Sequence, residues 1–210
     1  MKKLFTSIRN KDLTTVKSIL EDKPSLITSI STGAPKKDIG QSPLQIALKA
    51  SSTEIINYLL DKGADVNFIE SDEITTWRCP AIHDAINRAI MSSRWNVNRN
   101  GQLDVMNTKK DADDSFEILE KMIKLGADVN AKDSYGNSCL NRACLQARQI
   151  LPLKNSEDRI LTKELKADIS RIFNLLIKNG ADLNYICPNA SGKTCAELYK
   201  DDTVSIFLNK

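Results

Sequence analysis

His83 is the one histidine in the chain, and it is the first residue to weigh for acid–base or metal chemistry. A catalytic histidine needs a nucleophile or an orienting carboxylate within hydrogen-bond reach, and the sequence pairs no serine or cysteine with it. A zinc site needs several Cys or His ligands at short spacing. We therefore predict no catalytic residue and no metal site at His83.

The cysteines offer the next chance of chemistry, because thiolates act as nucleophiles and as metal ligands. Their number is odd, and no two of them are spaced as C-x-x-C. We predict reduced thiols that pack as small apolar side chains. The five positions are Cys79, Cys139, Cys144, Cys187 and Cys195.

The triplet Gly192-Lys193-Thr194 matches the end of a phosphate-binding loop. Such a loop carries another glycine five residues before the second one and follows a strand. Cys187 occupies that earlier position, and no strand is predicted before it. The sequence therefore predicts no nucleotide site and no cofactor.

The composition is that of an ordinary soluble protein, with 41% hydrophobic and 27% charged residues. Aromatic residues make up 5%, and there are 8 glycines and 6 prolines, which favours helices over a β-sandwich. A net charge of +3 is too small to imply binding to nucleic acid or to a membrane. No apolar run approaches the ~20 residues of a membrane span. We expect a cytoplasmic protein, or one secreted into a host cell by a route that needs no signal peptide.

One five-residue phrase organises the chain. Gly-Ala-Asp-Val-Asn begins at Gly63 and Gly126, and Gly-Ala-Asp-Leu-Asn begins at Gly180. Each copy follows a segment with apolar residues at helical spacing. Glycine suits the left-handed position that ends a helix, and Asp and Asn favour the turn that follows. Each phrase therefore predicts the end of a helix and a reversal of the chain.

A second, shorter helix is predicted downstream of the turns. It starts at Ser42, Ser138 or Thr194, whose hydroxyls can cap a helix N-terminus. Pro43 fits the first helical position, where its missing N–H has no partner to lose. The recurrent alanines of these segments allow close helix packing.

These residues resemble the ankyrin repeat, a unit of about 33 residues with a turn, two helices and a T-P-L-H-x-A signature. Ile82-His83-Asp84-Ala85 supplies the L-H-x-A part, and the resemblance makes His83 a structural hydrogen-bonding residue. It implies an all-α solenoid of about five helix-turn-helix units in one domain spanning residues 1–210. The expected units are 1–37, 38–70, 71–132, 133–186 and 187–210.

The three phrases lie farther apart than one repeat, so the third and fourth units carry roughly 30 and roughly 20 extra residues. We predict that residues 92–111 form a polar loop, followed by a helix that starts at Asp111 or Asp113. In the fourth unit we predict that the inner helix extends past Arg148 and ends at Pro152. There Ser156 is predicted to cap one long outer helix over about residues 157–179.

The resemblance implies that inner helices and turn tips form a concave protein-binding surface. Carried onto this chain, it predicts exposed inner-helix positions and exposed turn tips. The inner-helix positions are Ile46, Lys49, Asp84, Arg88, Arg142 and Gln146. The turn-tip positions are Phe68, Ile69, Glu70, Asp133, Tyr135 and Tyr185.

The insertion in the third unit adds a second candidate surface. Arg88, Arg94, Arg99, Lys109 and Lys110 gather there, with Trp77 and Trp95 nearby. Trp and Arg are enriched at binding hot spots, so these residues can form a contact patch. In the alternative interpretation, Trp95 folds back over the outer helix and the charges are solvated.

The leading hypothesis is a non-enzymatic module that masks or recruits another protein and is monomeric alone. Lys-, Ile- and Asn-rich usage indicates an AT-rich microbial, bacterial source, where an immunity protein or an effector fits. The alternatives are an enzyme with a site in the insertions, a nucleic-acid-binding adaptor, and a purely structural homo-oligomer.

Overall fold

Antiparallel pairs of helices account for most of the chain. The computed structural model describes residues 1–33, 35–50, 52–71, 77–99, 101–153, 158–188 and 192–208. The α-helices are α1 (Lys2–Arg9), α2 (Leu13–Asp22), α3 (Pro43–Ala50), α4 (Thr53–Asp61), α5 (Ala81–Met91), α6 (Lys109–Lys124), α7 (Cys139–Ala147), α8 (Lys163–Lys178) and α9 (Cys195–Leu198). Short 3-10 helices are η1 (Pro24–Thr28), η2 (Lys36–Asp38) and η3 (Thr203–Phe207).

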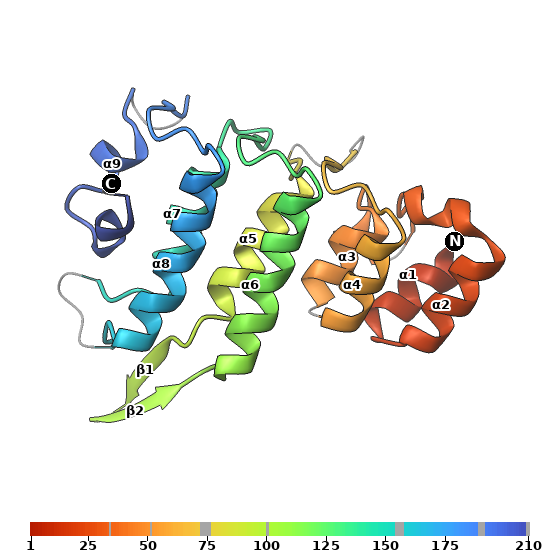
Figure 1. Cartoon of the computed structure of the whole chain (residues 1–210), viewed down its shortest axis with the longest axis horizontal. Helices are drawn as coiled ribbons and strands as arrows, with labels where there is room; N and C mark the ends of the chain where they lie inside the picture. The colour runs from red at the N-terminus through yellow and green to blue at the C-terminus, as the bar shows by residue number, and fades with distance from the viewer. Residues whose placement is uncertain are drawn as a thin grey trace.

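The helices form two rows (Figure 1). Helices α1, α3, α5, α7 and α9 contact one another in sequence and make the inner row, while α2, α4, α6 and α8 make the outer row. The 3-10 helix η3 packs on α8, where Phe207 stacks on Phe173 with ring centroids 5.6 Å apart. One continuous apolar core runs between the rows. Among the described residues, no helix has the length and apolarity to cross a bilayer.

The repeated phrase forms the joints that the sequence predicts. Gly63, Gly126 and Gly180 have φ of +82°, +93° and +91°, the left-handed region that suits glycine. Asn67 joins the first joint to the second: its amide donates to the Gly126 carbonyl over 2.9 Å and accepts from the Asp128 N–H over 2.8 Å. Asn130 repeats this bridge to the Gly180 carbonyl and the Asp182 N–H. The phrase therefore ends each helix and also couples it to the next pair.

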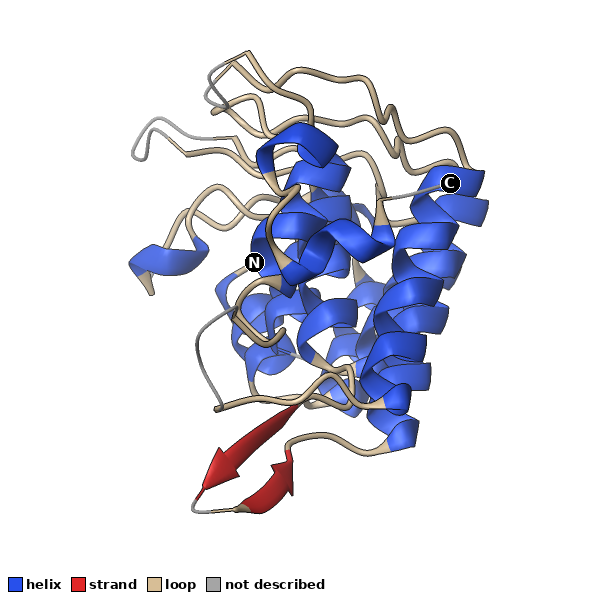
Figure 2. Cartoon of the chain, turned by 90° about the vertical axis from the view of Figure 1, so that its left-hand side faces the viewer, coloured by secondary structure: helices blue, strands red, loops and turns tan. Residues whose placement is uncertain are grey.

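The insertion after α5 is a β-hairpin, so the prediction of a polar loop over residues 92–111 is wrong. Strands β1 (Asn96–Arg99) and β2 (Gln102–Val105) pair antiparallel, with Asn96 opposite Val105 and Arg99 opposite Gln102. Asn100-Gly101 separates the strands in the sequence, and Asn-Gly is the strongest short-range hairpin signal. The hairpin projects beyond the helices (Figure 2). It precedes the N-terminus of α6, whereas the Gly126 joint follows the C-terminus of that helix.

Three predicted helix boundaries also need correction. Helix α6 begins at Lys109, because Thr108 accepts from the Asp111 N–H and Asp111 completes a capping box. Helix α7 ends at Ala147 and is not extended to Pro152. Helix α8 begins at Lys163 behind the capping hydroxyl of Thr162, so it is shorter than predicted. The predicted cap Ser156, with Glu157, lies outside the described residues.

Candidate functional site

The loop that follows each of the three joints exposes an apolar side chain. Ile69 is 49% exposed, Tyr135 is 49% exposed and Ile186 is 52% exposed. Ile69 and Ile186 occupy the same place in their units, two residues after the phrase. The neighbouring Phe68 is half-buried, so only part of the expected Phe68–Ile69 pair faces solvent. We call this row of side chains, with the groove described next, the turn surface.

A groove of about 470 Å³ lies between α1, η2 and α3 on one side and the loop after α4 on the other. Arg9 forms an ion pair with Asp38 in it, and the amide of Gln41 donates to the Lys37 carbonyl over 2.9 Å. Basic and apolar side chains share its walls. The lining residues are Arg9, Lys36, Lys37, Asp38, Ile39, Gln41, Ile46, Lys49, Ala50, Glu70 and Trp77.

One side of the groove is a charge cluster formed by Lys49 and the buried carboxylates of Glu70 and Asp84. The Lys49 Nζ lies 2.7 Å from Glu70 and 3.6 Å from Asp84. Gln45 also donates to Asp84 over 3.3 Å. Burial raises the pKa of Asp84 to about 7 despite the nearby Lys49. Burial would lower the pKa of Lys49, but the Asp84 and Glu70 carboxylates outweigh it and raise that pKa.

The expected exposure of Ile46, Glu70 and Asp84 is therefore wrong. They are 2%, 6% and 5% exposed. Helix α3 packs on α5, Asp84 accepts from Gln45 of α3, and Glu70 accepts from the Cys79 N–H. Ile46 forms part of the groove wall, and Lys49 is the exposed member of this cluster.

Asp133 centres a second cluster on the next loop. It is 5% exposed, so its predicted exposure is also wrong. It accepts from Arg142 over 2.8 Å and from Trp77 over 3.4 Å, and the Arg142 guanidinium lies over the Trp77 ring at 5.5 Å. Burial would raise the pKa of Asp133, but hydrogen bonds from Asn137, Trp77 and Arg142 outweigh it and lower that pKa. The cluster holds half-buried Trp77 against Arg142 of α7.

Three more predicted contact residues lie in or near the inner row. Tyr185 donates to the Gly136 carbonyl over 2.8 Å and so packs on the neighbouring loop. Half-buried Gln146 donates to Gln149 over 3.3 Å. Half-buried Arg88 donates to Thr53 over 2.9 Å and lines a polar pocket at the ends of the helices remote from the joints. Arg88 therefore lies away from the turn surface.

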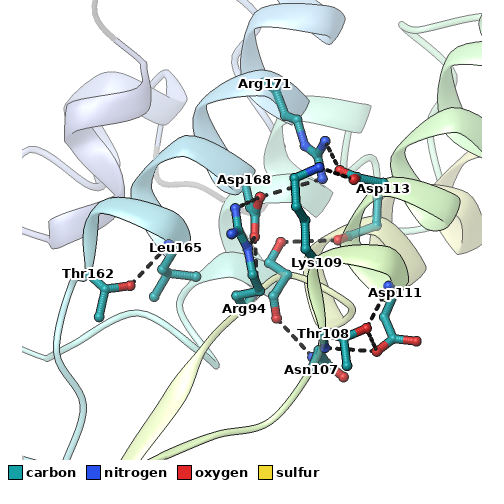
Figure 3. A network of polar contacts seen from close by, with 12 residues as sticks. Arg94, Asn107, Thr108, Lys109, Asp111, Asp113, Thr162, Leu165, Asp168 and Arg171 are labelled. Atoms are coloured by element: carbon teal, nitrogen blue, oxygen red, sulfur yellow. Dashed lines mark hydrogen bonds and ion pairs between the residues drawn. The ribbon is translucent and has the colours of Figure 1, made fainter.

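The insertion residues are held in a polar network (Figure 3). The Arg94 side chain makes two 2.8 Å hydrogen bonds to Asp168, and its backbone N–H makes a third over 3.0 Å. Asp168 is 2% exposed. Trp95 is half-buried against the core, donates to the Met91 carbonyl and has Arg159 over its ring. The structure thus favours the packing interpretation of Arg94 and Trp95.

The other cations of the insertion also lie next to carboxylates. Arg99 lies 3.9 Å from Asp104, Lys109 pairs with Asp113, and Lys110 lies 2.6 Å from Asp114. Asp113 also pairs with Arg171 over 2.6 Å, which connects α6 to α8. The predicted basic patch is therefore a set of ion pairs whose charges largely cancel.

The residues with the most reactive side-chain types are buried. His83 is fully buried and its Nε2 lies 3.1 Å from the Ala131 carbonyl, a contact between neighbouring units. The five cysteines are free and buried, and burial raises the pKa of Cys79 and Cys139. Among the described residues, no three Cys, His, Asp or Glu side chains gather as a metal site. These residues act as core and joint elements.

We expect His83 to make stability fall in acid. Burial lowers the pKa of His83 from 6.5 to about 4. Between pH 6.5 and 4 the unfolded chain is protonated while the folded chain is not, so the contribution of neutral His83 is lost as pH falls. At pH 4.5 the loss is about 2–3 kcal/mol.

Asp84 acts in the opposite direction, because its raised pKa lets the folded chain bind a proton first. The measurement is therefore the difference between wild type and His83→Gln in free energy of unfolding by urea. At pH 7.5 wild type should have the higher free energy of unfolding. At pH 4.5 its excess over His83→Gln should be smaller by about 2–3 kcal/mol. A difference independent of pH would contradict the assignment.

Sequence reasoning missed two features of this surface. Ile186 shares its place with Ile69, so aligning the repeated phrases would have found it. Lys36 and Lys37 line the groove from η2, a segment with no repeat signature.

The comparisons with known proteins agree with this architecture. Residues 39–71 match the family model of the ankyrin repeat. A fowlpox virus (strain NVSL) protein whose name describes it as an ankyrin repeat protein is 30% identical over 105 residues, or 49% of this chain. The match spans 15% of the length of that relative. Ankyrin repeats are generally protein–protein interaction modules. The family match therefore identifies an ankyrin repeat at residues 39–71, and the similarity to this relative extends over about half of the chain.

Proposed function

We propose that the chain is a non-enzymatic binding module that holds a partner protein against the turn surface. In this proposal the helix pairs are about five stacked repeats, at 1–37, 38–70, 71–132, 133–186 and 187–210. The family match at residues 39–71 supports the second of them. The inner helices and the loops would form the concave side of the stack, as in other repeat proteins.

The observation that carries the proposal is the row of exposed apolar side chains on coupled loops. Ile69, Tyr135 and Ile186 are each about half exposed, and the Asn67 and Asn130 bridges fix the spacing of the loops that bear them. Apolar groups held in a fixed array lose little entropy on binding. Trp77 at the groove supplies the aromatic group that hot spots favour.

The partner proposed here is another protein, with Lys49, Arg142 and Gln146 contributing polar contacts at the rim. The ion pairing of Arg94, Lys109 and Lys110 interrupts the basic stripe that nucleic acid would need. It therefore supports a protein partner over the nucleic-acid-binding alternative.

The test places a photo-crosslinking amino acid at single positions of the full chain in native lysate. Positions 69, 135 and 186 probe the turn surface, and exposed positions 61 and 174 on the outer helices are controls. One partner should crosslink from the first set and not from the second. Equal crosslinking from both sets would reject the turn surface.

With that partner purified, Ile69→Glu combined with Ile186→Glu should weaken binding by at least ten-fold, since truncating a hot spot costs 2 kcal/mol or more. Asn174→Glu, which adds the same charged side chain at an exposed position of the outer row, is the control, and calorimetry gives both affinities. An unchanged affinity for the double variant would contradict the proposal. An immunity role further predicts nanomolar binding to a toxin encoded by a neighbouring gene, and an effector role predicts translocation and a host partner.

A further inference from the structure

The hairpin that sequence analysis missed has an open outer edge. The Met106 N–H donates to the Trp95 carbonyl over 2.9 Å, and the Asn98 N–H points out of the hairpin to the Asp158 carbonyl over 2.7 Å. Bonded and non-bonded pairs alternate along an antiparallel ladder. Leu103, opposite Asn98, and Val105, opposite Asn96, therefore direct their backbone groups away from β1.

The two edges of the hairpin differ in what covers them. Residues 158–160 cover the β1 edge, where Asn96 also bonds the Ile160 N–H and carbonyl. Within the part of the chain that the structure describes, no backbone hydrogen bond covers the outward groups of Leu103 and Val105. The hairpin also projects away from the helices (Figure 2). An uncovered edge of this kind is a template for another strand.

The side chains at this edge are mostly apolar. Leu103 is 38% exposed, Val105 is 57% exposed and Met106 is 47% exposed. Leu103 and Val105 share one face of the hairpin, because strand side chains alternate. Asp104 lies between them on the other face, where Arg99 approaches it no closer than 3.9 Å in an exposed pair. Along the β2 edge, Leu103, Asp104 and Val105 therefore form the pattern apolar, acidic, apolar.

We propose that the β2 edge binds an extended strand of a partner protein with the pattern apolar, basic, apolar. In antiparallel register, the two apolar residues pair with Leu103 and Val105 through four backbone hydrogen bonds. The basic residue then faces Asp104 at a non-bonded position, where side chains lie closest. This surface is separate from the turn surface, and a partner can use it without occupying the groove.

The charge of Asp104 also disfavours binding of a second copy of the chain at the β2 edge. Pairing two β2 edges in the register that uses both outward residues of each copy would set Asp104 opposite Asp104. Like charges directly opposite each other destabilise an antiparallel pair. The edge is thus selective for a basic strand and is protected from pairing with itself.

The test uses the full chain and two labelled 12-residue peptides that differ in one residue, with Val-Lys-Val or Val-Glu-Val at the centre. Fluorescence anisotropy should show the Lys peptide binding about five-fold or more tightly than the Glu peptide. On binding, the amides of Leu103 and Val105 should gain protection from hydrogen exchange. Equal affinities, or protection confined to other residues, would overturn the proposal.

Two variants locate the preference. Asp104→Lys should reverse it in favour of the Glu peptide, and Asp104→Asn should bring the two affinities together even if the reversed charge disturbs the hairpin. Glu117→Lys makes the same change in charge at an exposed position of α6, and it should leave the preference for the Lys peptide as in wild type. A preference that follows net charge alone, shifting equally in Glu117→Lys, would reject the edge.

Analytical sedimentation of the free chain tests whether a second copy of the chain occupies the β2 edge. We expect no dimer that depends on the β2 edge. A wild-type dimer that Val105→Lys abolishes would show that a second copy occupies the edge, and it would overturn the proposal. Failure of the peptide tests leaves the turn-surface proposal standing, since the crosslinking positions there do not include the hairpin.

Discussion

Arg94→Ala should lower the free energy of unfolding by about 3 kcal/mol and release the base of the hairpin. Removing one partner of a buried ion pair costs about 3–5 kcal/mol, because the other charge stays buried. Asp168 is 2% exposed and accepts three hydrogen bonds from Arg94. Arg171, 3.5 Å away, and the backbone N–H of residue 94 keep the loss at the lower end of that range.

Urea unfolding measures this effect, and Arg99→Ala is the matched control. Arg99 is a nearby arginine whose contact with Asp104 is exposed and 3.9 Å long, so its loss should cost less than about 1 kcal/mol. Replacing Arg94 and Asp168 together by Leu should restore much of the stability, because no charge is then left buried. Similar losses in Arg94→Ala and Arg99→Ala would show that the network in Figure 3 does not anchor the hairpin.

Gly40→Ala should be the most damaging glycine substitution, with a loss of roughly 3 kcal/mol or more. A Cβ at this position would lie 2.2 Å from the Ser71 carbonyl oxygen, and φ is +84°. The Gly40 N–H donates to the Ser31 carbonyl, and the Gly40 carbonyl accepts from the Ser71 N–H. Relieving the clash therefore requires moving backbone that borders the groove.

Gly63→Ala is the control for Gly40→Ala. Gly63 has nearly the same φ of +82°, but a Cβ there would meet no atom within 4 Å. Its substitution should cost only the left-handed strain of an L-residue, about 1–2 kcal/mol. Thermal and urea unfolding of the two variants give the comparison. Equal losses of stability in the two variants would mean that the close approach of Gly40 to Ser71 adds nothing to the cost of the left-handed backbone conformation.

The two proposed surfaces lie at opposite ends of the helices. The turn surface lies at the end with the Gly63, Gly126 and Gly180 joints, and the β2 edge lies beyond the N-terminus of α6. Both depend on rigid support, from the asparagine bridges in one case and from the Arg94–Asp168 contact in the other. A partner protein that contacts both surfaces at once would bind more tightly than a partner that contacts one of them, because the second contact forms at a high effective concentration.

Local signals in the sequence determined the helices and their joints. A glycine with positive φ, a capping hydroxyl at Ser138 or Thr194 and an apolar stripe each act within a few residues. Such interactions need no distant partner, so the repeated phrase was enough to predict the helix pairs. The Asn-Gly signal of the hairpin is equally local and was present in the sequence, but the polar composition of residues 92–111 hid it.

Only the tertiary structure decided which charged residues face solvent. Arg94 meets Asp168 across 74 residues of sequence, and Lys49 meets Glu70 across 21. Residues this far apart in the sequence show no repeating pattern that would predict their contact. Each ion pair also neutralises two charges that the sequence alone would place on the surface. The same long-range packing buried Asp84 and Asp133 while leaving Ile69 and Val105 exposed, which reverses the usual order of polar and apolar residues. The sequence predicted the exposure of Ile69, but it predicted neither the burial of Asp84 and Asp133 nor the exposed edge at Val105.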